Sequence, residues 1–146
     1  MSETTDLMKA VRNAMRSRII TALNIDMKKR WQLPNTVFKK PTGGFWIRES
    51  FNEGSEEILT NAATRQYAVV NYEIFCEAAK GTGAADEAIK AIRSVLPVTG
   101  ANSVVYEANN QQAVVRSIDK PAGGIATDDP MWYRRMIAVT LYLYNV

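Results

Sequence analysis

Two segments rich in β-branched and aromatic residues constrain this fold more than any other feature of the chain. Residues 67–76 and 131–144 each predict a strand, on which successive side chains point to opposite faces. The last strand carries apolar side chains on both faces, so both need cover. One face holds Met131, Tyr133, Arg135, Ile137, Val139, Leu141 and Leu143, and the other holds Trp132, Arg134, Met136, Ala138, Thr140, Tyr142 and Tyr144.

Two further segments have helical periodicity. Apolar residues recur every four positions from Leu7 to Leu23, which predicts a helix over about 5–24. A second apolar stripe predicts a helix over 84–96, which Pro97 ends. The remaining strands are predicted at 45–51, 103–108 and 113–119, with a hairpin turn at 108–112 and loops at 52–65 and 120–130.

The resulting order is α-β-β-α-β-β-β. It predicts an α+β fold in which both helices pack on one face of a central antiparallel sheet. The length of 146 residues is typical of one domain, so we expect a single domain over 1–146. The first residues lack the apolar core of a signal peptide, and no apolar run approaches the roughly 20 residues of a membrane helix, so no membrane association is expected.

The second face of this sheet is too apolar to be left in water. Antiparallel sheets often expose a polar face, but large aromatic and aliphatic residues gather on this one. We expect either the 52–65 loop or a neighbouring subunit to cover it, and we favour the subunit. The residues concerned are Trp46, Tyr67, Val69, Phe75, Trp132, Met136, Tyr142 and Tyr144.

The composition argues against most catalytic chemistry. The chain has no His and a single Cys, which excludes His-based triads, His metal ligands and an internal disulfide. The adjacent carboxylates of Glu56–Glu57 and Asp128–Asp129 would diverge rather than converge on a substrate. Gly81-Thr82-Gly83 lacks the rest of a phosphate-binding fingerprint. We therefore expect no enzymatic activity, no metal and no cofactor.

The charge is divided unevenly along the chain. Residues 1–48 have ten Lys and Arg against three Asp and Glu, a net charge of +7, whereas residues 49–110 have a net charge of −5 and residues 111–146 of +1. Such a chain can bind copies of itself head to tail, or bind nucleic acid through region 9–48, or simply carry a solvated surface. Lys28, Lys29 and Arg30 form the densest basic run and are a candidate contact patch.

A mixture of rings and cations opens the last strand. Trp132-Tyr133-Arg134-Arg135 has the composition of single-strand nucleic-acid binders. Strand alternation would divide these side chains between two faces, so packing and a subunit interface are favoured.

Taken together, these landmarks resemble the tail-terminator, or tail-completion, proteins of tailed bacteriophages. The resemblance spans nearly the whole chain, although residues 49–57 are longer and more acidic than it predicts. It rests on the order of elements and on loose anchors, which are Pro34-Asn35, the Pro-x-Gly-Gly-x-Trp turn at 41–46, Gly81-x-Gly83 and Trp132-Tyr133.

The resemblance implies a subunit of a hexameric ring in the virion, at the head-proximal end of the tail. The ring would be assembled in the host cytoplasm, cap the tail tube, stop its polymerisation and join a neck or head-completion protein. It would also touch the sheath of a contractile tail, and DNA would pass through its lumen without sequence recognition. The expected subunit or tube contacts are Arg48, Glu56, Glu57, Arg65, Trp132, Arg134, Tyr142 and Tyr144.

Two alternatives stay open. Another ring-forming tail or neck protein, such as a tube protein or head–tail connector, would share this architecture. A protein of a different class, a nucleic-acid-binding module without sequence specificity, would use region 9–48. A hydrolase or transferase is a distant third.

Overall fold

The computed structural model describes residues 3–41, 43–60, 62–77, 83–119, 124–125 and 132–145. The elements are α1 (Glu3–Leu23), α2 (Met27–Arg30), β1 (Trp31–Gln32), β2 (Phe45–Thr60), β3 (Ala63–Glu77), α3 (Gly83–Val95), the 3-10 turn η2 (Ala101–Ser103), β4 (Val104–Ala108), β5 (Gln111–Asp119), β6 (Gly124–Ile125) and β7 (Trp132–Asn145).

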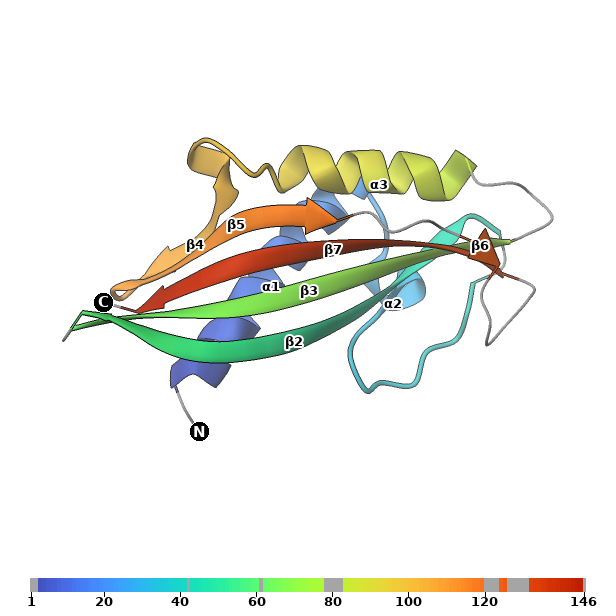
Figure 1. Cartoon of the computed structure of the whole chain (residues 1–146). Coiled ribbons are helices and arrows are strands. Elements are labelled where there is room, and N and C mark those ends of the chain that lie inside the picture. The colour runs from blue at the N-terminus through green and yellow to red at the C-terminus, as the bar shows by residue number, and fades with distance from the viewer. Residues whose placement is uncertain are drawn as a thin grey trace.

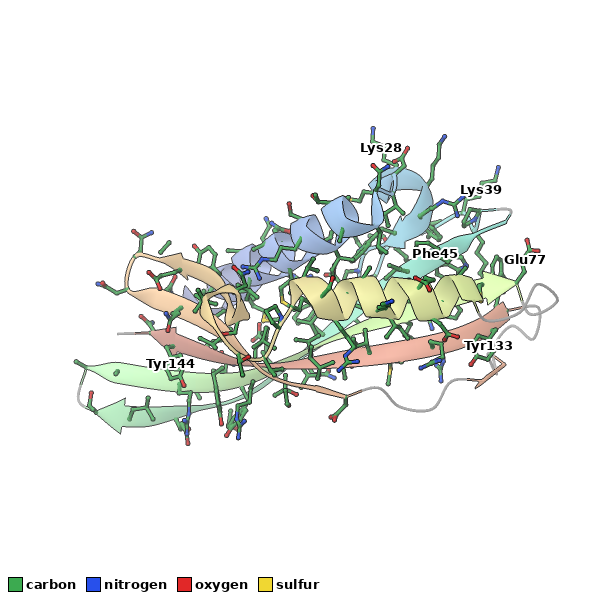
Figure 2. The ribbon with its side chains drawn as sticks, turned by 90° about the horizontal axis from the view of Figure 1, so that it is seen from above. Lys28, Lys39, Phe45, Glu77, Tyr133 and Tyr144 are labelled. Atoms are coloured by element: carbon green, nitrogen blue, oxygen red, sulfur yellow. The ribbon has the colours of Figure 1, made fainter. Side chains whose placement is uncertain are left out.

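One curled sheet with strand order β1-β2-β3-β7-β5-β4 organises these elements, and the short β6 pairs with β7 (Figure 1). All neighbours pair antiparallel except β1 and β2, which are parallel. Helices α1 and α3 lie on the same side of the sheet (Figure 2). The predicted α+β class is confirmed, and so is the order of the main elements, to which the structure adds α2, β1, η2 and β6.

The helices lie where their apolar stripes predict. In α1, Val11, Met15 and Ile19 are fully buried against the sheet. In α3, small residues face inward, since Ala85 and Ala88 are buried beside Ile92, and this lets the helix approach the strands closely. The inner face of the sheet and both helices therefore form one continuous core.

The prediction of a loop at 52–65 is wrong. Strands β2 and β3 continue through this segment as a hairpin, paired from Asn52–Val69 to Thr60–Ala63. Residues 52–60 are exposed on both faces, so no apolar period marks them. The strand is held by cross-strand pairing, which a single sequence does not show, and a register shift between Glu53 and Glu56 marks a β-bulge.

Other element ends differ by a few residues. The turn between β4 and β5 narrows to Asn109 and Asn110, whose φ angles of 51° and 64° suit the tight turns in which Asn is favoured. The predicted start of the last strand at Met131 lies outside the described residues. So does most of the 120–130 loop, including Asp128 and Asp129, although β6 lies within it. Gly81 and Thr82 are also outside.

A buried ion cluster fastens α1 to β2. The Glu49 carboxylate is 1% exposed and lies on the inner face of the sheet. Arg16 donates to it in a bidentate manner, with Nε–Oε1 at 2.7 Å and Nη2–Oε2 at 2.9 Å. Arg12 Nη1 and Trp31 Nε1 each donate at 3.1 Å. Four donated hydrogen bonds thus compensate the cost of burying this carboxylate.

Two other arginines bind backbone carbonyls. Arg18 donates to the carbonyl oxygens of Val95, Asn102 and Val104, which ties α1 to the end of α3 and to the start of β4. Arg30 donates to those of Gly43 and Phe45 at 3.1 and 2.8 Å. These cations complete the ends of secondary structure elements rather than facing solvent.

Replacement of Glu49 tests the importance of the buried cluster. Glu49→Gln should lower the free energy of unfolding by about 3–5 kcal/mol, because it leaves two guanidinium groups without their buried counter-charge. The matched control is Glu53→Gln on the exposed part of β2, which should change stability by less than about 0.5 kcal/mol. Urea unfolding followed by tryptophan fluorescence measures both. Equal stability of the two variants would contradict the assignment.

Candidate functional site: the outer face of the sheet

The outer face of the sheet, turned away from α1 and α3, is sealed by aromatic packing at one end. Trp46 and Phe75 are 2% exposed and their rings stack at a centroid distance of 4.2 Å and an interplanar angle of 11°. Trp132 meets Trp46 edge-on at 5.9 Å, and Phe38 packs on Trp46 at 5.2 Å. The 33–41 segment, not the predicted loop, therefore covers this tryptophan cluster. Trp132, expected as a contact with another subunit, is 9% exposed and packed within its own chain.

An ion network adjoins the tryptophan cluster. Arg48 donates to both carboxylate oxygens of Glu73, at 3.0 and 3.2 Å, and Arg134 Nη1 donates to Oε2 at 3.0 Å. The strand register brings them together, since Arg48 lies opposite Glu73 and Arg134 opposite Phe75. The side chains of Arg48 and Arg134 are 32% and 42% exposed. Two of the predicted contact residues thus share one acidic partner.

The opposite end of the outer face is open and forms a tyrosine cluster, made of Tyr67, Tyr142 and Tyr144 with Arg65 and Arg116. The phenolic oxygens of Tyr67 and Tyr142 are 2.9 Å apart, and their ring centroids are 4.7 Å apart. The Arg65 guanidinium lies 4.6 Å from the Tyr142 ring centroid, a cation–π contact. Arg116 Nε donates to the Tyr142 oxygen at 3.1 Å. Tyr67 remains 40% exposed.

Hydrogen bonding shifts the pKa values of the two phenols in opposite directions. The pKa of Tyr142 is lowered, first by its hydrogen bond with Tyr67 and then by the one from Arg116. The pKa of Tyr67 is raised, chiefly by the same hydrogen bond with Tyr142. Of the two phenols, Tyr142 is therefore the one whose ionisation is favoured.

The tip of the β2–β3 hairpin lies beside the tyrosine cluster. Figure 2 places Tyr144 toward this end of the sheet, and Glu77 and Tyr133 at the other. Glu57 forms an ion pair across the hairpin with Arg65, so the expected contacts Glu57, Arg65, Tyr142 and Tyr144 are brought together. Glu56 lies on the same exposed strand. Ile58 is 80% exposed and Leu59 is 44% exposed, which is unusual for large aliphatic side chains.

Of the predicted basic patch, Lys28, Lys29 and Arg30, only part is free of contacts with the described residues that would prevent it from binding a partner. Lys28 and Lys29 are exposed, and Lys28 points outward on the same side of the molecule as Lys39 (Figure 2). Arg30 is committed to the carbonyls of Gly43 and Phe45. The other arginines of region 9–48, namely Arg12, Arg16, Arg18 and Arg48, are all engaged within the chain.

Sequence reasoning missed two members of the site, and also the buried Glu49 on the inner face of the sheet. Glu73 and Arg116 are recognisable as partners of the site residues only from the strand register, which places Glu73 opposite Arg48 and Arg116 two residues beyond Val114, the residue opposite Tyr142. Glu49 interrupts an otherwise apolar face between Ile47 and Phe51, which was a readable signal that it has a buried partner.

Comparisons with known proteins bear on the fold alone. No protein-family model and no curated protein matches the sequence. Among solved structures 13 chains match. One of them, whose name describes no activity, superimposes with a TM-score of 0.63 at 14% sequence identity, over 92% of this chain and 96% of that chain. The architecture therefore recurs elsewhere.

Two further observations concern the described residues. They contain no group of three or more His, Cys, Asp or Glu arranged to hold a metal ion. None of their helices is both long and apolar enough to cross a membrane.

Removal of the Arg116 guanidinium tests the electrostatics of the tyrosine cluster. Arg116→Gln should raise the pKa of Tyr142, because it removes a cationic donor that favours the phenolate. Tyrosinate absorbance measured against pH reports the change, and Tyr142→Phe identifies which transition belongs to that residue. Lys9→Gln removes an exposed cation on α1 and should leave the transition in place. Equal shifts in the Arg116 and Lys9 variants would contradict the contact.

Proposed function

We propose that this chain is a structural assembly subunit of the tail-terminator type. Its copies associate into a ring, hexameric by the resemblance, that caps a phage tail tube, ends its polymerisation and joins the neck. One observation carries the proposal: the outer face, sealed at one end, presents an open aromatic and cationic surface beside an exposed hairpin at the other.

The residue types of the open end are those that concentrate binding energy at protein interfaces. Tyr and Arg are enriched among the interface residues whose truncation to alanine causes the largest loss of binding free energy. Such residues cluster where neighbouring contacts exclude water. Tyr67 and Tyr142 already hold each other by a 2.9 Å hydrogen bond, and Arg65 stacks on Tyr142. The surface is thus partly ordered before binding, so less side-chain entropy is lost on association.

The distribution of charge supports association between copies. The hairpin carries Glu53, Glu56 and Glu57, whereas exposed Lys90 and Arg93 lie on α3. Opposite charges on different parts of one molecule favour a head-to-tail contact, and such contacts close into rings when the rotation between copies allows it. A ring with a lumen is the assembly that the resemblance implies.

The nucleic-acid alternative is weakened by the use of the basic residues. Arginine is the cation best suited to bidentate phosphate contacts, and the five arginines of region 9–48 contact carboxylates or carbonyls of their own chain. The exposed lysines of this region could still contact DNA without sequence recognition. Such contacts are expected in the lumen of a ring as well as in an independent binding module.

Truncation of the tyrosine cluster should weaken association. Tyr142→Ala should raise the dissociation constant between subunits about tenfold or more, as expected for an interface residue worth about 2 kcal/mol. Sedimentation and native mass spectrometry over a concentration series measure this, with and without purified tail tubes. Lys9→Ala, an exposed change on α1, is the control. A chain that is monomeric throughout and does not bind tubes would contradict the ring.

Deletion from a phage that encodes the chain tests its role in assembly. Electron microscopy should show tails of abnormal length without heads, because nothing would end polymerisation or offer a surface to the neck. Complementation with the intact chain should restore virions. Tails of normal length that join heads would exclude a terminator role.

A mobility-shift titration separates the two classes of function. An independent nucleic-acid module should bind DNA near physiological salt, with affinity that falls steeply as salt rises. We expect no such binding by the isolated subunit. Tight binding that is lost when Lys28 and Lys29 are both changed to Gln would favour the alternative.

A further inference from the structure

The tip of the β2–β3 hairpin carries Glu56, Glu57, Ile58 and Leu59. Its acidic and apolar character is complementary to that of a hollow between α3 and β5, which is lined by basic and apolar residues. We infer that the hairpin tip of one copy docks into the hollow between α3 and β5 of the next copy. The inference rests on the proposed ring, and it names two surfaces that would meet between its subunits in addition to the tyrosine cluster.

The hairpin tip offers both apolar and acidic groups. Ile58 and Leu59 are adjacent near the end of β2, and both are exposed. Three glutamates and one arginine give residues 52–65 a net charge of −2. Such a tip is costly to leave in water and would be repelled by another acidic surface.

The hollow offers the opposite charge and matching apolar residues. It encloses about 600 Å³ between the end of α3, the segment that follows it, and β5. The exposed cations Lys90 and Arg93 line it, together with Arg116, whose Nε also donates to Tyr142 of the tyrosine cluster. Pro97, Val98 and Ile118 supply its apolar part, and Val98 is 48% exposed.

A chain cannot place its own tip in its own hollow. Strand β3 is paired with β7 from Glu77–Trp132 to Thr64–Asn145, so the hairpin is held in the sheet and cannot fold back on it. Figure 1 shows the tip at the far end of β2 and β3, well away from the end of α3. The contact is therefore between copies, and it joins two different surfaces, as a ring requires.

Side-chain docking fits this hairpin better than the addition of a strand. The outer edge of β2 beyond Arg48 has no partner strand among the described residues, which would invite edge pairing. The bulge between Glu53 and Glu56 and the charges beside it are devices that block such pairing. The tip is therefore the part of the hairpin that can bind a partner, and it would do so through its side chains.

Disulfide trapping tests the contact. The chain has a single cysteine, Cys76, which is buried, so the wild-type protein should not cross-link. Ile58→Cys and Val98→Cys, each made alone and then mixed, should give a disulfide-linked heterodimer at least tenfold more abundantly than either variant alone. One chain with both changes should give a ladder of linked oligomers.

Charge reversal supplies a test that does not depend on cysteine chemistry. Glu56→Lys and Arg93→Glu should each weaken self-association about tenfold, and a mixture of the two variants should regain part of it. Circular dichroism confirms that each variant is folded.

The outcomes separate the inference from the proposed function. Mixed cross-links with rescue by the charge pair support both. Rings seen by native mass spectrometry without mixed cross-links, or linkage of Ile58→Cys to itself, would overturn the docking and leave the ring. A chain that neither self-associates nor binds tubes would overturn the proposed function itself.

Discussion

The arrangement of this molecule depends on a carboxylate buried beneath a helix. Glu49 accepts hydrogen bonds from Arg12, Arg16 and Trp31, and so joins α1, β1 and β2 at one point. A buried ion pair adds little net stability compared with apolar packing, but it penalises every arrangement that separates its members. The cluster therefore selects one position for α1 along the sheet.

The same carboxylate influences the outer face through Trp31. Because Trp31 is held by Glu49 and by edge-on contact with Tyr72 at 5.7 Å, the chain leaves β1 in a defined direction. The 33–41 segment then carries Phe38 across to Trp46, and Gly43 N donates to Glu77 Oε1 at 3.0 Å beyond it. An interaction on the inner face thus places the cover of the tryptophan cluster on the outer one.

Burial explains which parts of the fold could be predicted. The helices and the central strands are buried on a regular face, and burial leaves a period in the sequence that residues such as Val11, Ile92 and Val139 reveal. The hairpin beyond Asn52 is buried on neither face, so its strands have no period to find. The shared face of Tyr67 and Tyr142 was predictable, whereas their contact with Arg116 depends on the pairing of β5 with β7, which only the register reveals.

The outer face is divided because the two ends of the sheet carry different cover. Strands β3 and β7 run without a register shift from the tryptophan cluster to the tyrosine cluster, so they form a continuous paired support beneath both. At the sealed end the chain supplies its own cover in Phe38, whereas at the open end Tyr67 remains 40% exposed. Because the same two strands lie beneath both clusters, the packing of the tryptophan cluster is already complete before a partner binds at the open end. That packing would therefore fix the orientation of the bound partner. Preorganisation of this kind reduces the entropy lost on assembly, and it is what a subunit needs if every copy in a closed ring is to meet its neighbour at the same angle.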